Sequence, residues 1–368
     1  MDQFMLKGNF CYSLSPDRIA ILENGYLVCA GKQIVGLFET CPEEYQHLPC
    51  MDFEDKLIIP GMTDLHLHAP QFAFRGLGMD MELLDWLNTH TFPEESKYQD
   101  PDYAHDAYSI FTKHLRQSTT TRACIFSTIH VTATKILMDK MEASGLCTYV
   151  GKVNMNRNSP PYLCETSVEQ ALADTEEWIL HSKATYERTK PILTPRFIPS
   201  CTDELMRGLR GLQVKYGLPV QSHLSENFGE IAWVKELCPN SAFYGDAYDQ
   251  FGLFGRDYPC VMAHCVHSSP EELQRIKENG VFIAHSPESN TNLASGVAPV
   301  NTFLQMGLNV GLATDVAGGS HESLLRAMVQ AIQASKLRWR LLDQEVKPLS
   351  FDQAFYLATA GGGMFFGK

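Results

Sequence analysis

Two histidines separated by one residue, His66 and His68, end an apolar segment that reads LIIPGMTDLHLH. On a β-strand the residues i and i+2 point to the same face, so both imidazoles can reach one cation. A single HxH pair is a weak signal. It gains weight here from His223 in QSHLSE and Asp315 in LATDVAGG, which follow later apolar segments. Three imidazoles and a carboxylate suit a borderline ion such as Zn²⁺ and leave a position for water.

Two further side chains could serve hydrolysis at such a centre. Glu226 lies three residues after His223, and a carboxylate there could carry a proton from water to a substrate nitrogen. The alternative is a surface glutamate that begins the next helix, where the helix dipole favours it. His264 ends the segment YPCVMAH and could hydrogen-bond the activated water, or could be a buried histidine bonded to a backbone carbonyl.

Three other polar residues at predicted strand ends have open roles. His130 and His285 are as well explained by structural hydrogen bonds as by chemistry. Lys152 could be carboxylated and bridge two metals, but a packing or salt-bridge lysine is the favoured interpretation. The sequence therefore predicts one metal ion per chain.

Eight short apolar segments must position these residues, and they alternate with longer amphipathic stretches from residue 57 onward. They are 57–65, 120–129, 146–153, 191–197, 218–224, 259–264, 281–285 and 308–314. Helices are expected between them, for example over 168–187, 203–216, 270–279 and 322–336. This alternation predicts an α/β fold, a (β/α)₈ TIM-type barrel, whose active site lies at the carboxyl ends of the strands.

The chain divides into two predicted domains. Residues 1–56 contain short alternating segments (3–13, 18–23, 26–30 and 33–38) that indicate a small β-rich accessory domain. Residues 57–368 form the barrel, with an insertion at 70–118 between its first two strands.

Bulk composition narrows the class of partner. The net charge of −13 gives no electrostatic footprint for nucleic acid, so a small neutral or weakly charged substrate is expected. The 11 cysteines are scattered without a CxxC pair, which is typical of reduced thiols in a cytoplasmic protein. No segment has the uninterrupted apolar length of a membrane helix, so no membrane partner is expected.

Several of these segments together resemble a known family. PGMTDLHLHAPQ, HLSEN, MAH and LATDVAGG resemble the metal-dependent amidohydrolase superfamily. The segments 70–93 (PQFAFRGLGMDMELLDWLNTHTFP), 149–153, 194–197 (TPRF) and 311–319 are similar to its guanine deaminase branch. The resemblance covers nearly all of residues 57–363.

The resemblance implies hydrolytic deamination of guanine to xanthine and ammonia by a zinc-activated water, and a homodimer. It implies zinc ligands at His66, His68, His223 and Asp315, and catalytic roles for Glu226, Asp315 and His264. It implies substrate contacts from Gln71 to the purine edge, from Arg196 to O6, from Phe197 to the ring, and from Glu226. Leu84, Trp86 and Phe92 of the insertion would help to cover the substrate.

The sequence departs from this branch in two places. Cys265 follows His264 where a glycine is more usual. Family members also continue past glycines such as 361–363 with strands that would complete the small β-domain, so truncation after Lys368 is an open expectation.

Three alternatives remain open. The first is a related aminohydrolase acting on another purine, a pterin or a triazine. The second is a non-catalytic scaffold with the amidohydrolase fold. The third is a binuclear hydrolase of cyclic amides, which would need Lys152 as a bridge.

Overall fold

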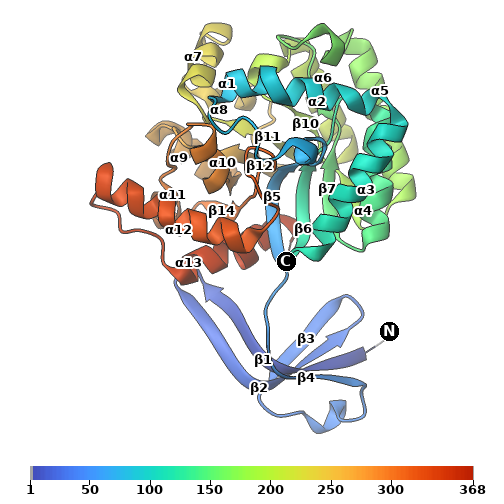
Figure 1. Cartoon of the computed structure of the whole chain (residues 1–368), viewed down its shortest axis with the longest axis vertical. Helices are drawn as coiled ribbons and strands as arrows, with labels where there is room; N and C mark the ends of the chain where they lie inside the picture. Colours follow the sequence, from blue (N-terminus) through green and yellow to red (C-terminus); the bar gives the residue numbers. More distant parts are fainter. Residues whose placement is uncertain (1–2, 368) are drawn as a thin grey trace. The chain divides into compact units, whose positions relative to one another are not determined.

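The computed structural model describes residues 3–367, which divide into two compact units after Gly61 (Figure 1). The first unit is a four-stranded sheet of β1 (Gln3–Ser15), β2 (Arg18–Ala30), β3 (Gln33–Phe38) and β4 (Cys50–Ile58). Its strand order is β3-β2-β1-β4, with β1 and β4 parallel and the other pairs antiparallel. The two segments expected at 18–23 and 26–30 form one strand, because a register shift between Gly8 and Phe10 absorbs the irregularity near Gly25.

The second unit contains two four-stranded sheets in which every pair of strands is parallel. One has the order β5 (Met62–His68), β6 (Thr120–Phe126), β7 (Cys147–Gly151) and β9 (Thr189–Pro191). The other has the order β11 (Val220–Leu224), β12 (Cys260–His264), β13 (Phe282–His285) and β14 (Asn309–Leu312). A short parallel pair joins β8 (Val153–Asn154) to β10 (Thr194–Pro195). The predicted α/β class with parallel strands is confirmed.

The first predicted strand of this unit has the wrong bounds. It was expected over 57–65, but β5 covers Met62–His68, and Leu57 and Ile58 end β4 of the small unit. Pro60 and Gly61 separate the two strands. Proline cannot donate to a strand ladder and glycine weakens one, so an apolar run that contains both breaks at that point.

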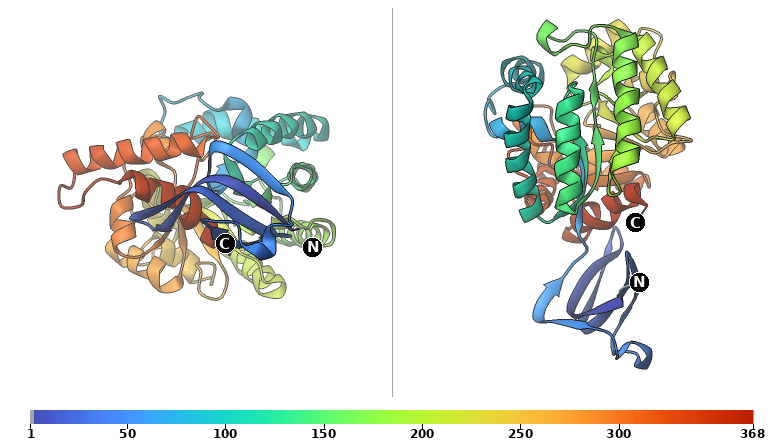
Figure 2. Two further views of the ribbon diagram at one scale, coloured as in Figure 1. Left: turned by 90° about the horizontal axis from the view of Figure 1, so that it is seen from below. Right: turned by 90° about the vertical axis from the view of Figure 1, so that its right-hand side faces the viewer.

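Helices follow the strands and lie outside them, as α3, α4 and α5 do beside β6 and β7 (Figures 1 and 2). The longer ones are α3 (Pro101–Gln117), α4 (Val131–Ser144), α5 (Val168–Thr185), α6 (Asp203–Tyr216), α7 (Phe228–Leu237), α9 (Pro270–Asn279) and α12 (Leu324–Leu341). Short helices are α8 (Tyr244–Asp249), α10 (Pro287–Asn292), α11 (Val300–Gln305) and α13 (Phe351–Tyr356). Among the described helices none is both long and apolar enough to cross a membrane.

Helix bounds agree with capping chemistry. The side chain of Thr202 accepts the N–H of Leu205 at the start of α6, and Gly217 ends this helix in the left-handed conformation at φ +66°. The insertion after β5 contains α1 (Leu83–Trp86), a π-helical turn (Leu87–Thr91) and α2 (Phe92–Ser96).

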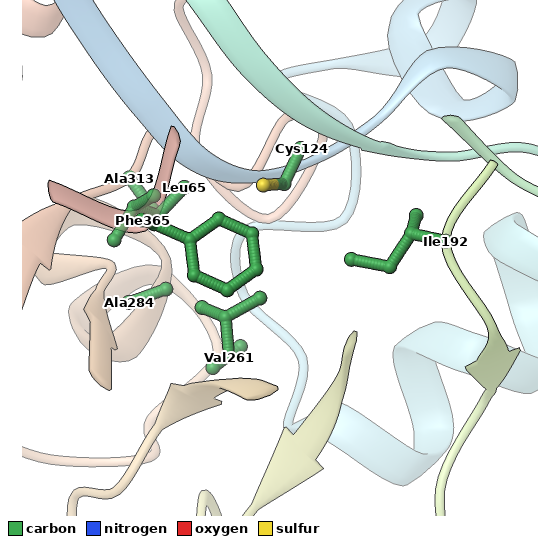
Figure 3. Packing of buried hydrophobic residues seen from close by; sticks show 8 residues of the cluster. Leu65, Cys124, Ile192, Val261, Ala284, Ala313 and Phe365 are labelled. Atoms are coloured by element: carbon green, nitrogen blue, oxygen red, sulfur yellow. The ribbon is translucent and has the colours of Figure 1, made fainter. Parts of the chain in front are cut away.

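A buried apolar cluster lies between the strands of the two sheets (Figure 3). Its members are Leu65, Cys124, Ile192, Val261, Ala263, Ala284, Ala313 and Phe365. The Phe365 ring comes from the last turn of the chain and lies among side chains of β5, β12 and β13 (Figure 3). This core fixes the strands whose carboxyl ends carry the polar residues described next.

Candidate active site

Three imidazoles and a carboxylate converge at the carboxyl ends of β5, β11 and β14. Nε2 of His68 lies 3.2 Å from Nε2 of His66 and 3.2 Å from Nε2 of His223. Oδ1 of Asp315 lies 3.0 Å from Nε2 of His66 and 3.5 Å from Nε2 of His68. His68 and His223, which are 155 positions apart in the chain, thus bring their ring nitrogens to the same place.

The hydrogen bonding of His223 fixes which of its ring nitrogens faces the cluster. Nδ1 of His223 donates to the carbonyl of Arg196 at 2.6 Å, which leaves its Nε2 as the unprotonated nitrogen. Burial lowers the pKa of His66, His68 and His223. Burial alone would raise the pKa of Asp315, but the neighbouring imidazoles hold it well below its usual range. The surroundings therefore favour the neutral form of these imidazoles and the ionised form of the Asp315 carboxyl.

A residue that sequence reasoning missed, Asp64, fixes the two strands that carry His66 and Asp315. Its Oδ2 accepts the hydroxyl of Thr314 at 2.5 Å, and its Oδ1 accepts the N–H of Thr314 at 3.1 Å. Burial raises the pKa of Asp64 to about 7. Its position two residues before His66 on a buried strand was the available signal, because i and i−2 share a face.

The strand ends turn sharply into the site. His264, Cys265 and Asp315 have φ values of +75°, +51° and +47°, a region that non-glycine residues rarely occupy. Such conformations persist where the surroundings impose them, and they cluster at functional sites. Cys265, which stands where the resemblance leads us to expect a glycine, is buried and adopts the left-handed backbone that a glycine would adopt.

Glu226 and His264 form a second polar group beside the cluster. Oε2 of Glu226 lies 3.4 Å from Nε2 of His264, whose Nε2 is 3.7 Å from Oδ2 of Asp315. The hydroxyl of Ser295 donates to Oε1 of Glu226 at 3.1 Å. Burial raises the pKa of Glu226 to about 7, against the opposing effect of His264. Glu226 is thus not the exposed helix-start residue of the alternative interpretation.

The neighbourhood of Glu226 contains another carboxylate that the sequence did not single out. Glu230 accepts the N–H of Glu226 at 3.1 Å and the hydroxyl of Tyr244 at 2.7 Å. It is four residues after Glu226, so the spacing of one helical turn was the signal. These bonds hold the loop before α7 in place.

Two of the predicted substrate-edge residues share a hydrogen-bond partner. Gln71 and Arg196 are both buried, and both hydrogen-bond Glu95 of α2. Phe197 is 7% exposed and packs edge-on against Trp233 with ring centroids 6.0 Å apart.

A pocket of about 420 Å³ joins the two groups of residues. Its walls are formed by His68, Gln71, Leu83, Trp86, Leu87, Arg196, Phe197, His223, Glu226, Glu230, His264, Leu293 and Asp315. The insertion contributes Leu83, Trp86 and Leu87 rather than the expected Leu84. Phe92 lies behind the wall, with its ring centroid 5.3 Å from the Arg196 guanidinium.

The three residues with open roles differ in environment. Nζ of Lys152 donates to Oε1 of Glu165 at 2.5 Å, and both side chains are buried. Neither ring nitrogen of the buried His285 has a hydrogen-bond partner within residues 3–367, and burial lowers its pKa to about 3. His130 is half-buried, and its Nε2 also has no partner within that range.

Comparisons with known proteins identify the family to which the sequence is similar. The model of the amidohydrolase family matches residues 57–368. The guanine deaminase of Dictyostelium discoideum is 40% identical over 85% of this chain and 69% of its own length. The guanine deaminase of Rattus norvegicus is 37% identical over 99% of this chain and 82% of its own length.

A solved structure is also similar. The crystal structure of guanine deaminase from C. acetobutylicum, with guanine bound in its active site, superposes with a TM-score of 0.97. It is 48% identical, and the alignment covers all of this chain and 87% of that one.

Proposed function

Since the chain belongs to the amidohydrolase family, we propose that it hydrolyses guanine to xanthine and ammonia. The observation that carries the proposal is the pocket of the second unit. It joins an imidazole and carboxylate cluster to a buried, protonatable Glu226 and to the hydrogen-bonding wall of Gln71 and Arg196. One reaction needs all three parts: water activation, proton transfer and recognition of a polar ring edge.

We infer that the parallel strands of the second unit close into a (β/α)₈ barrel and that the first unit is the small β-domain. The boundary lies after Gly61 rather than after residue 56, because Leu57 and Ile58 belong to β4. Backbone hydrogen bonds support closure on both sides of the sheets. The N–H of Asp315 donates to the carbonyl of His66 at 2.9 Å, and the N–H of His68 donates to that of Val316 at 2.8 Å. On the other side, Leu193 and Val220 form a parallel bridge.

The donor set fits one zinc ion per chain, held by His66, His68, His223 and Asp315. Ligand atoms around a tetrahedral ion with bonds of about 2.0–2.1 Å lie roughly 3.3 Å apart. The four separations between donor atoms given above, which range from 3.0 to 3.5 Å, agree with this. When bound, the ion would lower the pKa of a water molecule and supply hydroxide at neutral pH.

Glu226 would move the protons of the reaction. With its pKa near 7, its carboxyl can accept a proton from water and deliver it to the ring nitrogen beside C2. Water adds to C2, the amino group receives a proton, and the C2–N bond breaks to release ammonia and leave xanthine. The carboxylates of Glu226 and Asp315 outweigh burial and raise the pKa of His264, so its imidazolium can donate to the attacking oxygen.

The pocket walls would select the heterocycle. Arg196 would donate to O6, Gln71 would bond the purine edge, and Phe197 would pack against the ring. A site that hydrogen-bonds polar groups of its substrate rejects analogues without them far better than an apolar pocket does. For this reason we favour guanine over other amino-heterocycles. We further propose a cytoplasmic homodimer, which sedimentation at several concentrations would test.

Ultraviolet monitoring of guanine conversion, with ammonia measured in parallel, tests the activity. We expect turnover that a chelator abolishes and zinc restores. Asp315→Ala should lose activity and zinc together, and Glu226→Gln should lose activity while it retains zinc. Full activity of either variant, or a preference for a pterin or triazine over guanine, would contradict the proposal.

A further inference from the structure

Glu95 is a buried carboxylate to which the mechanism above gives no role. It lies in α2, in the insertion, and is 1% exposed. Its two oxygens have different partners. Oε1 accepts Nε2–H of Gln71 at 2.9 Å, and Oε2 accepts Nη1–H of Arg196 at 2.7 Å. One side chain therefore contacts both polar residues of the substrate-edge wall.

The contact with Glu95 fixes which way the Gln71 amide faces. A carboxylate only accepts hydrogen bonds, so the amide atom that faces Glu95 must be the nitrogen. The amide oxygen then accepts the N–H of Ala317 at 3.3 Å. The second N–H of the amide and the remaining lone pair of its oxygen are left for a ligand.

The contact with Arg196 changes the charge of the wall. Arg196 is 2% exposed, and Glu95 is its carboxylate partner. A guanidinium has five donors, so Arg196 retains donors for the pocket after it bonds Glu95. The pair carries no net charge, although each member is charged. This wall of the pocket therefore offers a ligand strong hydrogen-bond donors, and its positive charge is balanced by Glu95.

We propose that Glu95 is a positioning residue that makes the substrate edge selective for a neutral lactam over an anionic one. This proposal rests on the proposed function, and it adds that the site prefers a neutral ligand to an anionic one. Without Glu95, Arg196 would face the pocket as an uncompensated cation in a water-excluded site, where charges interact strongly. Such a wall would favour an anionic heterocycle, and the Gln71 amide would be free to rotate.

Three variants distinguish the effect of the Glu95 charge from the effect of its side-chain length and from a general effect on folding. Glu95→Gln keeps the size and removes the charge. Glu95→Asp keeps the charge and shortens the reach. Glu94→Gln is the matched control, because Glu94 is a buried glutamate of the same helix that bonds Lys97 and Tyr103 and does not line the pocket.

The readouts are guanine turnover and two inhibition constants, measured in mildly alkaline buffer. Hypoxanthine is largely neutral there, whereas xanthine is largely an anion. For Glu95→Gln we expect kcat/KM for guanine to fall about 100-fold, because a misplaced binding group costs about that much. We expect binding of xanthine relative to hypoxanthine to strengthen about tenfold. Glu94→Gln should stay within about threefold of the wild type in each quantity.

Each outcome decides the proposal. An unchanged ratio of inhibition constants in Glu95→Gln would overturn it even if turnover fell, since a purely structural role lowers turnover alone. If that variant does not fold, Glu95→Asp decides: it should lose turnover and keep the wild-type ratio, and any other result overturns the proposal. A wild-type protein that does not deaminate guanine refutes the proposed function instead, whatever Glu95 does.

Discussion

Glu226 and His264 face each other across 3.4 Å in a place where both side chains are at least 97% buried. Burial disfavours charge on both groups, and the attraction between them opposes it. As a result the pKa of Glu226 rises only to about 7, and the pKa of His264 also rises. A pKa near 7 lets Glu226 take up and release a proton at neutral pH, which suits a proton shuttle, but burying its charged form costs stability.

The cost of burying the Glu226 carboxylate predicts how the stability of the protein depends on pH. The folded protein binds the Glu226 proton more tightly than the unfolded chain, where the pKa is 4.5, so stability falls as the pH rises from about 4.5 through about 7. In the metal-free protein, Glu226→Gln should therefore be more stable than the wild type by about 3 kcal/mol above pH 7. The difference should vanish below about pH 4, where both chains carry a neutral side chain.

Urea unfolding at several pH values measures this effect. Glu177→Gln is the control, because Glu177 forms an exposed ion pair with Lys135 and should differ from the wild type by less than about 1 kcal/mol. A constant gap between Glu226→Gln and the wild type from acid to alkaline pH would contradict the stated cause.

Metal removal should lower the melting temperature. The donor atoms come from β5, β11 and the loop after β14, so the site exists only in the folded chain. A ligand that binds only the folded state stabilises it by mass action. Chelation should lower Tm, and zinc should restore it. A His66→Ala, His68→Ala double variant should show neither response, so a chelator effect of wild-type size on that variant would place the ion elsewhere.

Much of the site follows from strand periodicity and strand ends. The i, i+2 rule brought His66 and His68 together. Parallel strands placed His223, His264 and Asp315 at the same edge, where the structure has them. Glu226 also lies within the pocket, three residues past its strand.

The sequence did not reveal residues whose contacts join separate elements, because no regular spacing along the chain relates the two partners. Glu95 meets Gln71 and Arg196 through an irregular insertion, and no spacing relates positions 24 and 101 residues apart. Asp64 was visible on the strand, but its partner Thr314 was not. The bounds of the first strand failed because Pro60 and Gly61 were included in an apolar run that they interrupt.

Gly319 should control the placement of Asp315. A Cβ at this position would lie 1.9 Å from the carbonyl oxygen of Thr314, and backbone cannot swing aside as a side chain does. Gly319→Ala should therefore displace the turn that carries Asp315 and reduce zinc affinity about 10- to 100-fold, the range found for disturbed support of a metal ligand.

Zinc titration of the two purified proteins, with activity measured beside it, tests this prediction. Gly211→Ala is the control, since a Cβ there meets nothing within 4 Å and the position is on the exposed side of α6. That change should stabilise the helix by about 0.5–1 kcal/mol and leave zinc binding unaltered. Equal zinc affinities for Gly319→Ala and the wild type would show that the turn can move without moving its carboxylate.

Lys152 distinguishes one metal ion from two. Its ammonium is buried and paired with Glu165, which also accepts the N–H of Met155 at 2.9 Å. If this pairing is its role, Lys152→Met should leave zinc content at one per chain and lower stability by about 3–5 kcal/mol, because Glu165 would be left buried without its cation. The variant Lys152→Met, Glu165→Leu should recover part of that loss, as the uncompensated charge is gone. A bridging lysine predicts a different result by elemental analysis: a content near two in the wild type that falls when Lys152 is replaced.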